Sequence, residues 1–134
     1  MSNQPYISVI TSVFNGERYI EKSIESILNQ SYDEFEYIII DDSSNDSTPQ
    51  ILGRYLNCSK IKVITNVHNV GLTKSLNIGL TNAAGKYIAR QDADDISLRN
   101  RLKVQKEFLD SNKNVGVLAT SNHYINAKGE VIST

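Results

Sequence analysis

Apolar residues in this chain recur with two alternating periods, and this alternation constrains the fold more than any other feature. Residues 6–14, YISVITSVF, are short, β-branched and nearly continuously apolar, as expected for a strand covered on both faces. From Glu17 onward the period changes, because Ile20, Ile24 and Ile27 recur at helical spacing with charged residues between them. The switch between the two periods then repeats along the chain.

The alternating periods predict five strands and four helices. Strands are expected at residues 6–14, 35–41, 60–66, 86–90 and 115–120, and helices after residue 17, from about residue 48, at 70–85 and at 97–112. Pro49 lies in the first turn of the second helix, and Gly85 is expected to cap the end of the third. A β-hairpin is expected at residues 121–133, with Lys128 and Gly129 at its turn.

Strands and helices that alternate in this way form a mostly parallel sheet with helices on both faces, because each right-handed crossover returns the chain in the same direction. The predicted fold class is therefore α/β and Rossmann-like. In such sheets ligands bind beyond the carboxyl ends of the strands, where the strand order reverses. Three polar clusters follow strand ends: FNGE after the first strand, DDSSND after the second and QDADD after the fourth. We expect these clusters to converge on one crevice.

Size and charge exclude several classes of protein. A chain of 134 residues, 40% hydrophobic and 22% charged, is typical of a single globular domain, here residues 1–134. Its formal net charge of -1 and scattered basic residues give no stripe for nucleic acid, so no nucleic-acid partner is expected. No apolar run approaches the roughly 20 residues of a membrane span. The single cysteine, Cys58, excludes an internal disulfide and favours a reducing cytoplasm.

The acidic cluster in QDADD requires something to offset its charge. Asp92, Asp94 and Asp95 stand so close together that either water or a cation must reduce their repulsion. Two carboxylates separated by one residue can face one hard cation, and carboxylate oxygens suit Mg²⁺ or Mn²⁺. Coordination positions left open are commonly filled by phosphate oxygens of a substrate. The alternative is that Asp94 or Asp95 caps the helix expected from Ser97.

A second acidic pair, Asp41 and Asp42, ends the second strand. One carboxylate is expected to turn inward and hold the following loop, and the other to face a ligand, accepting a hydrogen bond from a nucleobase or a ribose hydroxyl. The alternative is a turn device without a ligand. Phe14 is either a stacking surface for a base or an ordinary core residue. Lys74, early in the third helix, is either a solvated side chain or a phosphate contact.

Two long stretches carry a family resemblance. ISVITSVFNGERYIEKSIESILNQSYDEFEYIIIDDSSNDST and NVGLTKSLNIGLTNAAGKYIARQDADD resemble the N-terminal half of the family 2 glycosyltransferases, which are inverting enzymes of the GT-A fold that use nucleotide-sugar donors. The resemblance runs from about Tyr6 through the last expected strand, nearly the whole chain. It is specific because several motifs occur in the family's order.

The resemblance implies a set of nucleotide-sugar-binding positions. They are Val13, Phe14, Asn15, Asp42, Lys74, Asp92, Ala93 and Asp94. The first three match the strand end that lies against the nucleotide base, and Asp42 matches the acid that recognises the base, often uracil. Asp94 matches the direct ligand of Mn²⁺ or Mg²⁺, with Asp92 nearer the ribose or a bound water. The metal is expected to bridge the donor's diphosphate and to stabilise it as it leaves.

The resemblance also implies a missing partner in catalysis. In this family a carboxylate deprotonates the acceptor hydroxyl while the leaving group departs from the other face. That base is expected beyond Thr134, in an acceptor-binding part, so no catalytic residue is assigned here. We therefore expect the donor-binding half of a larger enzyme, inactive alone, whose acceptor is a glycan or lipid-linked and whose work is polysaccharide biosynthesis. The expected location is cytoplasmic, with the inner face of the membrane as the alternative for the full-length protein.

Other classes of protein fit parts of the pattern. A receiver-like, Mg²⁺-binding phospho-acceptor domain is the main alternative, because it also has a parallel sheet and an acidic pair after an apolar strand. In a receiver, however, that pair follows the first strand, whereas IIIDD follows the second. A sugar-nucleotide pyrophosphorylase has a glycine-rich loop after the first strand, whereas VFNGER is poor in glycine. The sequence leaves the sugar, the nucleotide, the acceptor and the oligomeric state open.

Overall fold

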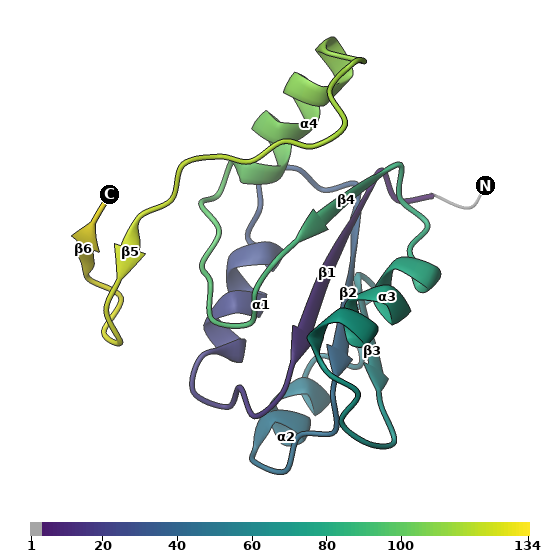
Figure 1. The fold of residues 1–134 in the computed structure, drawn as a ribbon, viewed down its shortest axis with the longest axis vertical. Coiled ribbons are helices and arrows are strands. Elements are labelled where there is room, and N and C mark those ends of the chain that lie inside the picture. Colours follow the sequence, from purple (N-terminus) through teal and green to yellow (C-terminus); the bar gives the residue numbers. More distant parts are fainter. Residues whose placement is uncertain (1–3) are drawn as a thin grey trace. The chain divides into compact units, whose positions relative to one another are not determined.

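The computed structural model describes residues 4–134 (Figure 1). Its helices are α1 (Ile20–Leu28), α2 (Thr48–Gly53), α3 (Leu72–Asn82) and α4 (Arg101–Ser111). Its strands are β1 (Ile7–Val13), β2 (Phe35–Asp41), β3 (Ile61–Thr65), β4 (Tyr87–Arg90), β5 (Tyr124–Ile125) and β6 (Val131–Ser133). The chain groups into two compact units, residues 1–104 and 105–134.

The first unit is built on a four-stranded, wholly parallel sheet in the order β3-β2-β1-β4. The chain adds β2 and β3 on one side of β1 and then returns to add β4 on the other side. The strand order therefore reverses between β1 and β4, which is where ligands bind in open α/β sheets. This order confirms the predicted α/β class. It also differs from the 2-1-3-4-5 order of receiver domains, in which the third strand lies beside the first.

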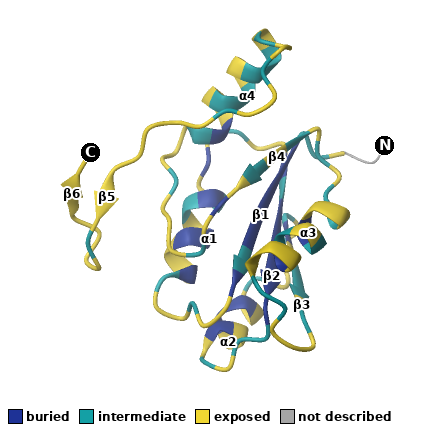
Figure 2. Cartoon of the chain, viewed as in Figure 1, coloured by how far each residue is buried: buried dark blue, intermediate teal, exposed yellow. Residues whose placement is uncertain are grey.

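Helices cover both faces of this sheet, as the alternating periods predict. On one face α1 and α2 pack against the apolar side chains of β1 and β2, together with Leu102 from the first turn of α4. On the other face Ile10, Ile38 and Ile40 pack against α3. Figure 2 shows the resulting burial, with the central strands dark and the outer faces of the helices exposed. Because β1 and β2 are buried on both faces, their sequences are nearly continuously apolar.

Two boundary predictions are wrong. The fourth helix was expected from residue 97 and begins at Arg101, because Ser97 is held by hydrogen bonds to Ser26 and Gln91. The third helix ends at Asn82, so Gly85 does not cap it. Gly85 instead lies against β1, where an added Cβ would stand 2.5 Å from the backbone nitrogen of Ser8. Glycine is required there by the close approach of two backbones.

The second unit contains the C-terminal hairpin. Strands β5 and β6 pair antiparallel, and Gly129 at the turn has a φ of 86°, which confirms the hairpin predicted around Lys128 and Gly129. The strand predicted at residues 115–120 does not form, and Val117 is 90% exposed. A strand needs a neighbour for its hydrogen bonds, and no described strand pairs with this segment.

Within residues 4–134, no helix combines the length and the apolar character needed to cross a bilayer.

Candidate functional site

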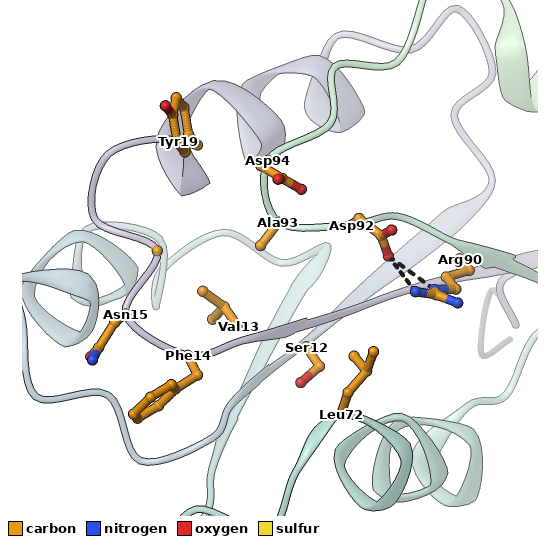
Figure 3. A pocket seen from close by; sticks show the side chains of 11 residues that line it. Ser12, Val13, Phe14, Asn15, Tyr19, Leu72, Arg90, Asp92, Ala93 and Asp94 are labelled. Carbon is orange, nitrogen blue, oxygen red and sulfur yellow. Dashed lines mark hydrogen bonds and ion pairs between the residues drawn. The ribbon is translucent and has the colours of Figure 1, made fainter. Parts of the chain in front are cut away.

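A cavity of about 320 Å³ lies at the carboxyl ends of β1 and β4, where the strand order reverses. Figure 3 shows it from close by. It is lined by Ser12, Val13, Phe14, Asn15, Gly16, Tyr19, Leu72, Arg90, Asp92, Ala93 and Asp94. These residues come from the end of β1 and its loop, from the start of α3, and from the loop after β4. The cavity thus occupies the position that an α/β sheet offers to a ligand.

The cavity brings together most, but not all, of the residues selected from the sequence. Val13, Phe14, Asn15, Asp92, Ala93 and Asp94 line it. Asp42 and Lys74 do not. Lys74 is exposed in the first turn of α3, whose first residue, Leu72, does line the cavity.

The loop after β1 is held in an unusual backbone conformation. Asn15 has a φ of 53°, the left-handed region that Asn tolerates better than most residues. Its backbone nitrogen donates to Ser44 Oγ at 2.9 Å, and its side-chain Oδ1 accepts from the nitrogen of Asn45 at 2.9 Å. Phe14, just before this turn, is half exposed at the cavity. The interpretation of Phe14 as an ordinary core residue is therefore wrong.

The cluster after β2 does not line the cavity, so the prediction that all three polar clusters converge there is wrong. Its side chains instead fasten the loop after β1. Asp46 Oδ2 accepts from the nitrogen of Glu17 at 3.1 Å, and Glu17 Oε2 accepts from that of Ser47 at 2.8 Å. Burial raises the pKa of Asp46, but hydrogen bonds from Thr48 and Glu17 outweigh it and hold that pKa below its usual range.

Both acids at the end of β2 point inward. Asp41 is 1% exposed and Asp42 is 2% exposed. Asp41 Oδ1 accepts a hydrogen bond from the backbone nitrogen of Ser44 at 3.0 Å. In this structure both carboxylates hold the loops that follow β2 and β3.

Asp42 fixes the segment that leads into α3. Its Oδ1 accepts from Asn66 Nδ2 at 2.8 Å and from the nitrogen of Val70 at 2.9 Å, and its Oδ2 accepts from the nitrogen of Gly71 at 2.9 Å. Burial raises the pKa of Asp42, yet these hydrogen bonds and one from Ser75 more than offset it, so its pKa is lowered. Asp42 thereby sets where α3 begins, and with it the position of Leu72.

The loop after β4 is organised by Gln91, which sequence reasoning missed. Gln91 continues the β1–β4 ladder through its backbone nitrogen, and its side chain is buried. The side-chain Nε2 donates to Ser23 Oγ at 3.1 Å and to the carbonyl of Asp95 at 2.8 Å. The side-chain Oε1 accepts from Ser97 Oγ at 2.8 Å and from Arg101 Nη1 at 2.7 Å. A single buried amide thus closes the turn that carries the acidic cluster.

The acidic side chains themselves remain exposed. Arg90 donates through Nε to Asp92 Oδ1 at 2.9 Å, and Ser23 Oγ donates to the carbonyl of Asp92 at 3.0 Å. Asp95 lies outside the cavity lining. Its partial burial and the negative charges of Asp92 and Asp94 raise the pKa of the Asp95 carboxyl above its usual range. The positive charges of Arg101 and Arg90 act in the opposite direction and offset part of this repulsion.

Comparison with known proteins assigns this chain to a family. Residues 8–132 match the model of the family described as Glycosyl transferase family 2. This chain belongs to glycosyl transferase family 2. The match spans both the loop after β1 and the acidic loop after β4, and it confirms the resemblance found in the sequence.

Relatives within glycosyl transferase family 2 are longer than this chain. The putative glycosyltransferase EpsE of Bacillus subtilis is 44% identical over 122 residues, which make up 90% of this chain and 44% of EpsE. An uncharacterized glycosyltransferase of Haemophilus influenzae is 41% identical over 121 residues, 90% of this chain and 38% of that protein. The chain therefore spans less than half the length of these two relatives.

Solved structures of glycosyltransferases share the fold. TarS of S. aureus, in complex with UDP-GlcNAc, superposes with a TM-score of 0.75 at 34% identity, covering 80% of this chain and 32% of that one. The mannosyltransferase PcManGT of Pyrobaculum calidifontis, in complex with GDP-Man and Mn²⁺, gives 0.71 at 25% identity, covering 79% and 32%. Both are GT-A glycosyltransferases, so the GT-A fold expected from the sequence is confirmed.

The donor atoms of the acidic loop suit a hard cation with few protein ligands. Within residues 4–134, no group of three His, Cys, Asp or Glu residues is placed to hold a metal ion. In that same range, Asp94 and the Oδ2 of Asp92 accept no hydrogen bond and remain available at the cavity. Two carboxylates leave coordination positions for phosphate oxygens, which is how Mg²⁺ is usually held. The residues therefore fit a divalent cation that is bound together with a phosphate ligand.

Five lining residues were not selected from the sequence. They are Ser12, Gly16, Tyr19, Leu72 and Arg90. A signal for Arg90 existed, because residues two apart in an extended segment point to the same side, and Arg90 stands two before Asp92. The remaining four residues have no distinctive sequence pattern. They line the cavity only because of the way β1, α1 and α3 pack together.

Proposed function

We propose that this chain is the donor-binding part of a metal-dependent inverting glycosyltransferase. It would bind a nucleotide-diphosphate sugar, for which a UDP-sugar is our first choice. The sugar would then be transferred to an acceptor hydroxyl. One observation carries the proposal: a single cavity holds the exposed ring of Phe14 and the exposed carboxylates of Asp92 and Asp94. A nucleotide sugar carries a flat base and, beyond its ribose, a diphosphate. The aromatic ring suits the base, and the carboxylates suit a cation that binds the diphosphate.

The proposed roles follow the position of each residue around the cavity. Val13, Phe14 and Asn15 would lie against the base, on a loop that hydrogen bonds between Asn15 and residues 44 and 45 keep in place. Asp94 and Asp92 would hold Mn²⁺ or Mg²⁺. When bound, that cation would supply positive charge to the departing nucleotide diphosphate. TarS with UDP-GlcNAc and PcManGT with GDP-Man and Mn²⁺ support donors and a cation of these kinds.

Asp42 and Lys74 lie outside the cavity lining, and we also propose roles for them in binding the donor. Oδ2 of Asp42 accepts a hydrogen bond from the nitrogen of Gly71, and a carboxylate oxygen can accept two. Recognition of a base N–H by Asp42 therefore requires this buried carboxylate to become accessible. Lys74 is exposed on the first turn of α3 and is proposed as a contact to the diphosphate, which its long side chain would reach by rotation.

The general base is proposed to come from outside residues 1–134. The carboxylates that line the cavity are Asp92 and Asp94, and both are committed to the donor in this proposal. The acceptor, a glycan or a lipid-linked group, would be bound by a further part of the protein. Sugar transfer would then require that part, with polysaccharide biosynthesis as the proposed role of the whole enzyme.

Calorimetric titration of UDP tests the donor site. UDP is expected to bind in the presence of Mn²⁺, and Asp94→Ala is expected to weaken that binding by about tenfold or more, because the cation loses a charged oxygen ligand. The control is Asp33→Ala, which removes an exposed acid that is paired with Lys60 and lies outside the cavity lining. It should bind UDP as the unaltered chain does.

Two results would contradict the proposal. One is UDP binding that is the same with and without Mn²⁺ and is unchanged in Asp94→Ala. That result would exclude a role for the metal in binding the donor. The other is the absence of binding by UDP, GDP and dTDP in a chain whose circular dichroism shows the fold intact.

A further inference from the structure

The cavity contains a built-in competitor for the cation. Arg90 is the last residue of β4, and its guanidinium donates to Asp92 Oδ1 through Nε at 2.9 Å, with Nη2 also 2.9 Å from the same oxygen. Both side chains belong to the cavity lining, and the dashed lines in Figure 3 mark the contacts between them. A carboxylate that the proposed function gives to a divalent cation is therefore already paired with a guanidinium.

Among residues 4–134, Arg90 is the one cationic residue that lines the cavity, alongside the acids Asp92 and Asp94. The neighbouring Arg101 is committed elsewhere, because it donates to the Gln91 side chain at 2.7 Å and to the Arg90 carbonyl at 2.7 Å. Any exchange of charge partners inside the cavity therefore involves the Arg90 side chain.

The ion pair between Arg90 and Asp92 is weak enough to exchange. Their side chains are 56% and 48% exposed, and an ion pair this exposed shifts an equilibrium by only a factor of roughly two to five. The backbone beneath them is fixed, because Ser23 Oγ holds the carbonyl of Asp92 and the amide of Gln91 is buried. Exchange therefore needs only side-chain rotation and no movement of the loop.

We propose that Arg90 exchanges partners during donor binding: it holds Asp92 while no cation is present, and turns to the donor's diphosphate when a divalent cation takes Asp92. This inference rests on the proposed function. A divalent cation and a guanidinium repel one another at a shared carboxylate, so cation binding releases Arg90. The released guanidinium remains in the cavity, and its forked N–H donors match the anionic oxygens of a diphosphate.

The exchange makes the cation and the nucleotide depend on one another. Without a nucleotide, the cation must displace Arg90 from Asp92 and leave the guanidinium without a protein partner at the cavity. With a diphosphate present, the displaced guanidinium gains a new anionic partner, and the cation gains phosphate ligands. By thermodynamic reciprocity, each ligand then strengthens the binding of the other by the same factor.

The experiment compares Arg90→Gln with Arg54→Gln. Arg54 forms a similarly exposed ion pair with Glu21, with side chains 62% and 51% exposed, and lies outside the cavity lining. Both variants lose one positive charge. With Mn²⁺ alone, followed by calorimetry or by the electron paramagnetic resonance signal of free Mn²⁺, Arg90→Gln should bind the ion about three- to tenfold more tightly. Arg54→Gln should match the unaltered chain within about twofold.

The second arm uses nucleotides at saturating Mn²⁺. Arg90→Gln should bind UDP about tenfold more weakly, because a charge-assisted contact to the diphosphate is lost. Uridine, which lacks the phosphates, should bind both chains alike. The two arms therefore have opposite signs: the same substitution strengthens Mn²⁺ binding and weakens UDP binding.

Other outcomes overturn the inference. Equal Mn²⁺ affinity in Arg90→Gln and the unaltered chain would show that Arg90 does not compete with the cation. Equal UDP affinity would show that Arg90 does not turn to the diphosphate. An equal gain in Arg54→Gln would assign the effect to net charge alone. If the competition is absent while Mn²⁺-dependent UDP binding persists, the inference fails and the proposed function stands. If the unaltered chain binds neither UDP, GDP nor dTDP, the proposed function fails, and the exchange fails with it.

Discussion

Replacing Asp42 with alanine is expected to lower the free energy of unfolding by about 3 to 5 kcal/mol, because it leaves partly buried donors without their acceptor. The carboxylate accepts hydrogen bonds from Asn66, Val70 and Gly71, and each is assisted by its charge. Alanine offers no acceptor, and little water reaches a site that is 2% exposed. Urea denaturation followed by circular dichroism measures the change through the midpoint and the slope of the transition.

The same substitution should change how stability depends on pH. The folded-state pKa of Asp42 is lowered, so its contribution to stability is present above the unfolded-state pKa of about 3.9 and is lost as the pH falls through the folded value. Asp42→Ala should therefore lose less stability between pH 5 and pH 2 than the unaltered chain does. Some acid dependence should remain, because the pKa of Asp46 is lowered as well.

Asp33→Ala serves as the matched control for Asp42→Ala. It removes an acid that forms a largely exposed ion pair with Lys60. The change in the free energy of unfolding should therefore stay within about 0.5 kcal/mol. A loss of less than about 1 kcal/mol in Asp42→Ala would contradict the role given to that carboxylate. It would mean that the segment leading into α3 is held by packing and not by Asp42.

The fold was predictable because the information for it is local. The period of apolar residues changes within each segment, so β1 to β4 and the helices between them can be found without knowing their neighbours. Residues 115–120 show the limit of this approach, because an apolar, β-branched run forms a strand only where another strand offers its hydrogen bonds. The expected strand at these residues is absent for that reason.

The site was predictable in position and less so in detail. Topology places the ends of β1 and β4 side by side, and six of the predicted residues line the cavity there. The direction in which a side chain points depends on partners distant in sequence. Asp42 turns inward because Asn66, Val70 and Gly71 offer donors to it, and nothing in the motif IIIDD specifies them.

Gln91→Ala is expected to lower the free energy of unfolding by about 3 kcal/mol, a large effect for one neutral side chain. The amide makes four side-chain hydrogen bonds, two as donor, to Ser23 and Asp95, and two as acceptor, from Ser97 and Arg101. Alanine would leave the partly buried guanidinium of Arg101 and a buried hydroxyl without these partners. Urea denaturation gives the overall loss, with Gln50→Ala, an exposed glutamine on α2, expected to stay within about 0.5 kcal/mol.

Hydrogen exchange distinguishes a local role of Gln91 from general packing. If the amide closes the acidic turn, backbone amides at residues 92–102 should exchange much faster in Gln91→Ala, while exchange in the centre of β1 and β2 should accelerate only in proportion to the loss of global stability. A uniform increase across the sheet would instead make Gln91 an ordinary core residue. Since Asp92 and Asp94 lie on this turn, its loosening should also weaken Mn²⁺ binding, whereas Arg90→Gln strengthens it. Opposite effects from neighbouring residues would show that Gln91 positions the acidic cluster and Arg90 competes for it.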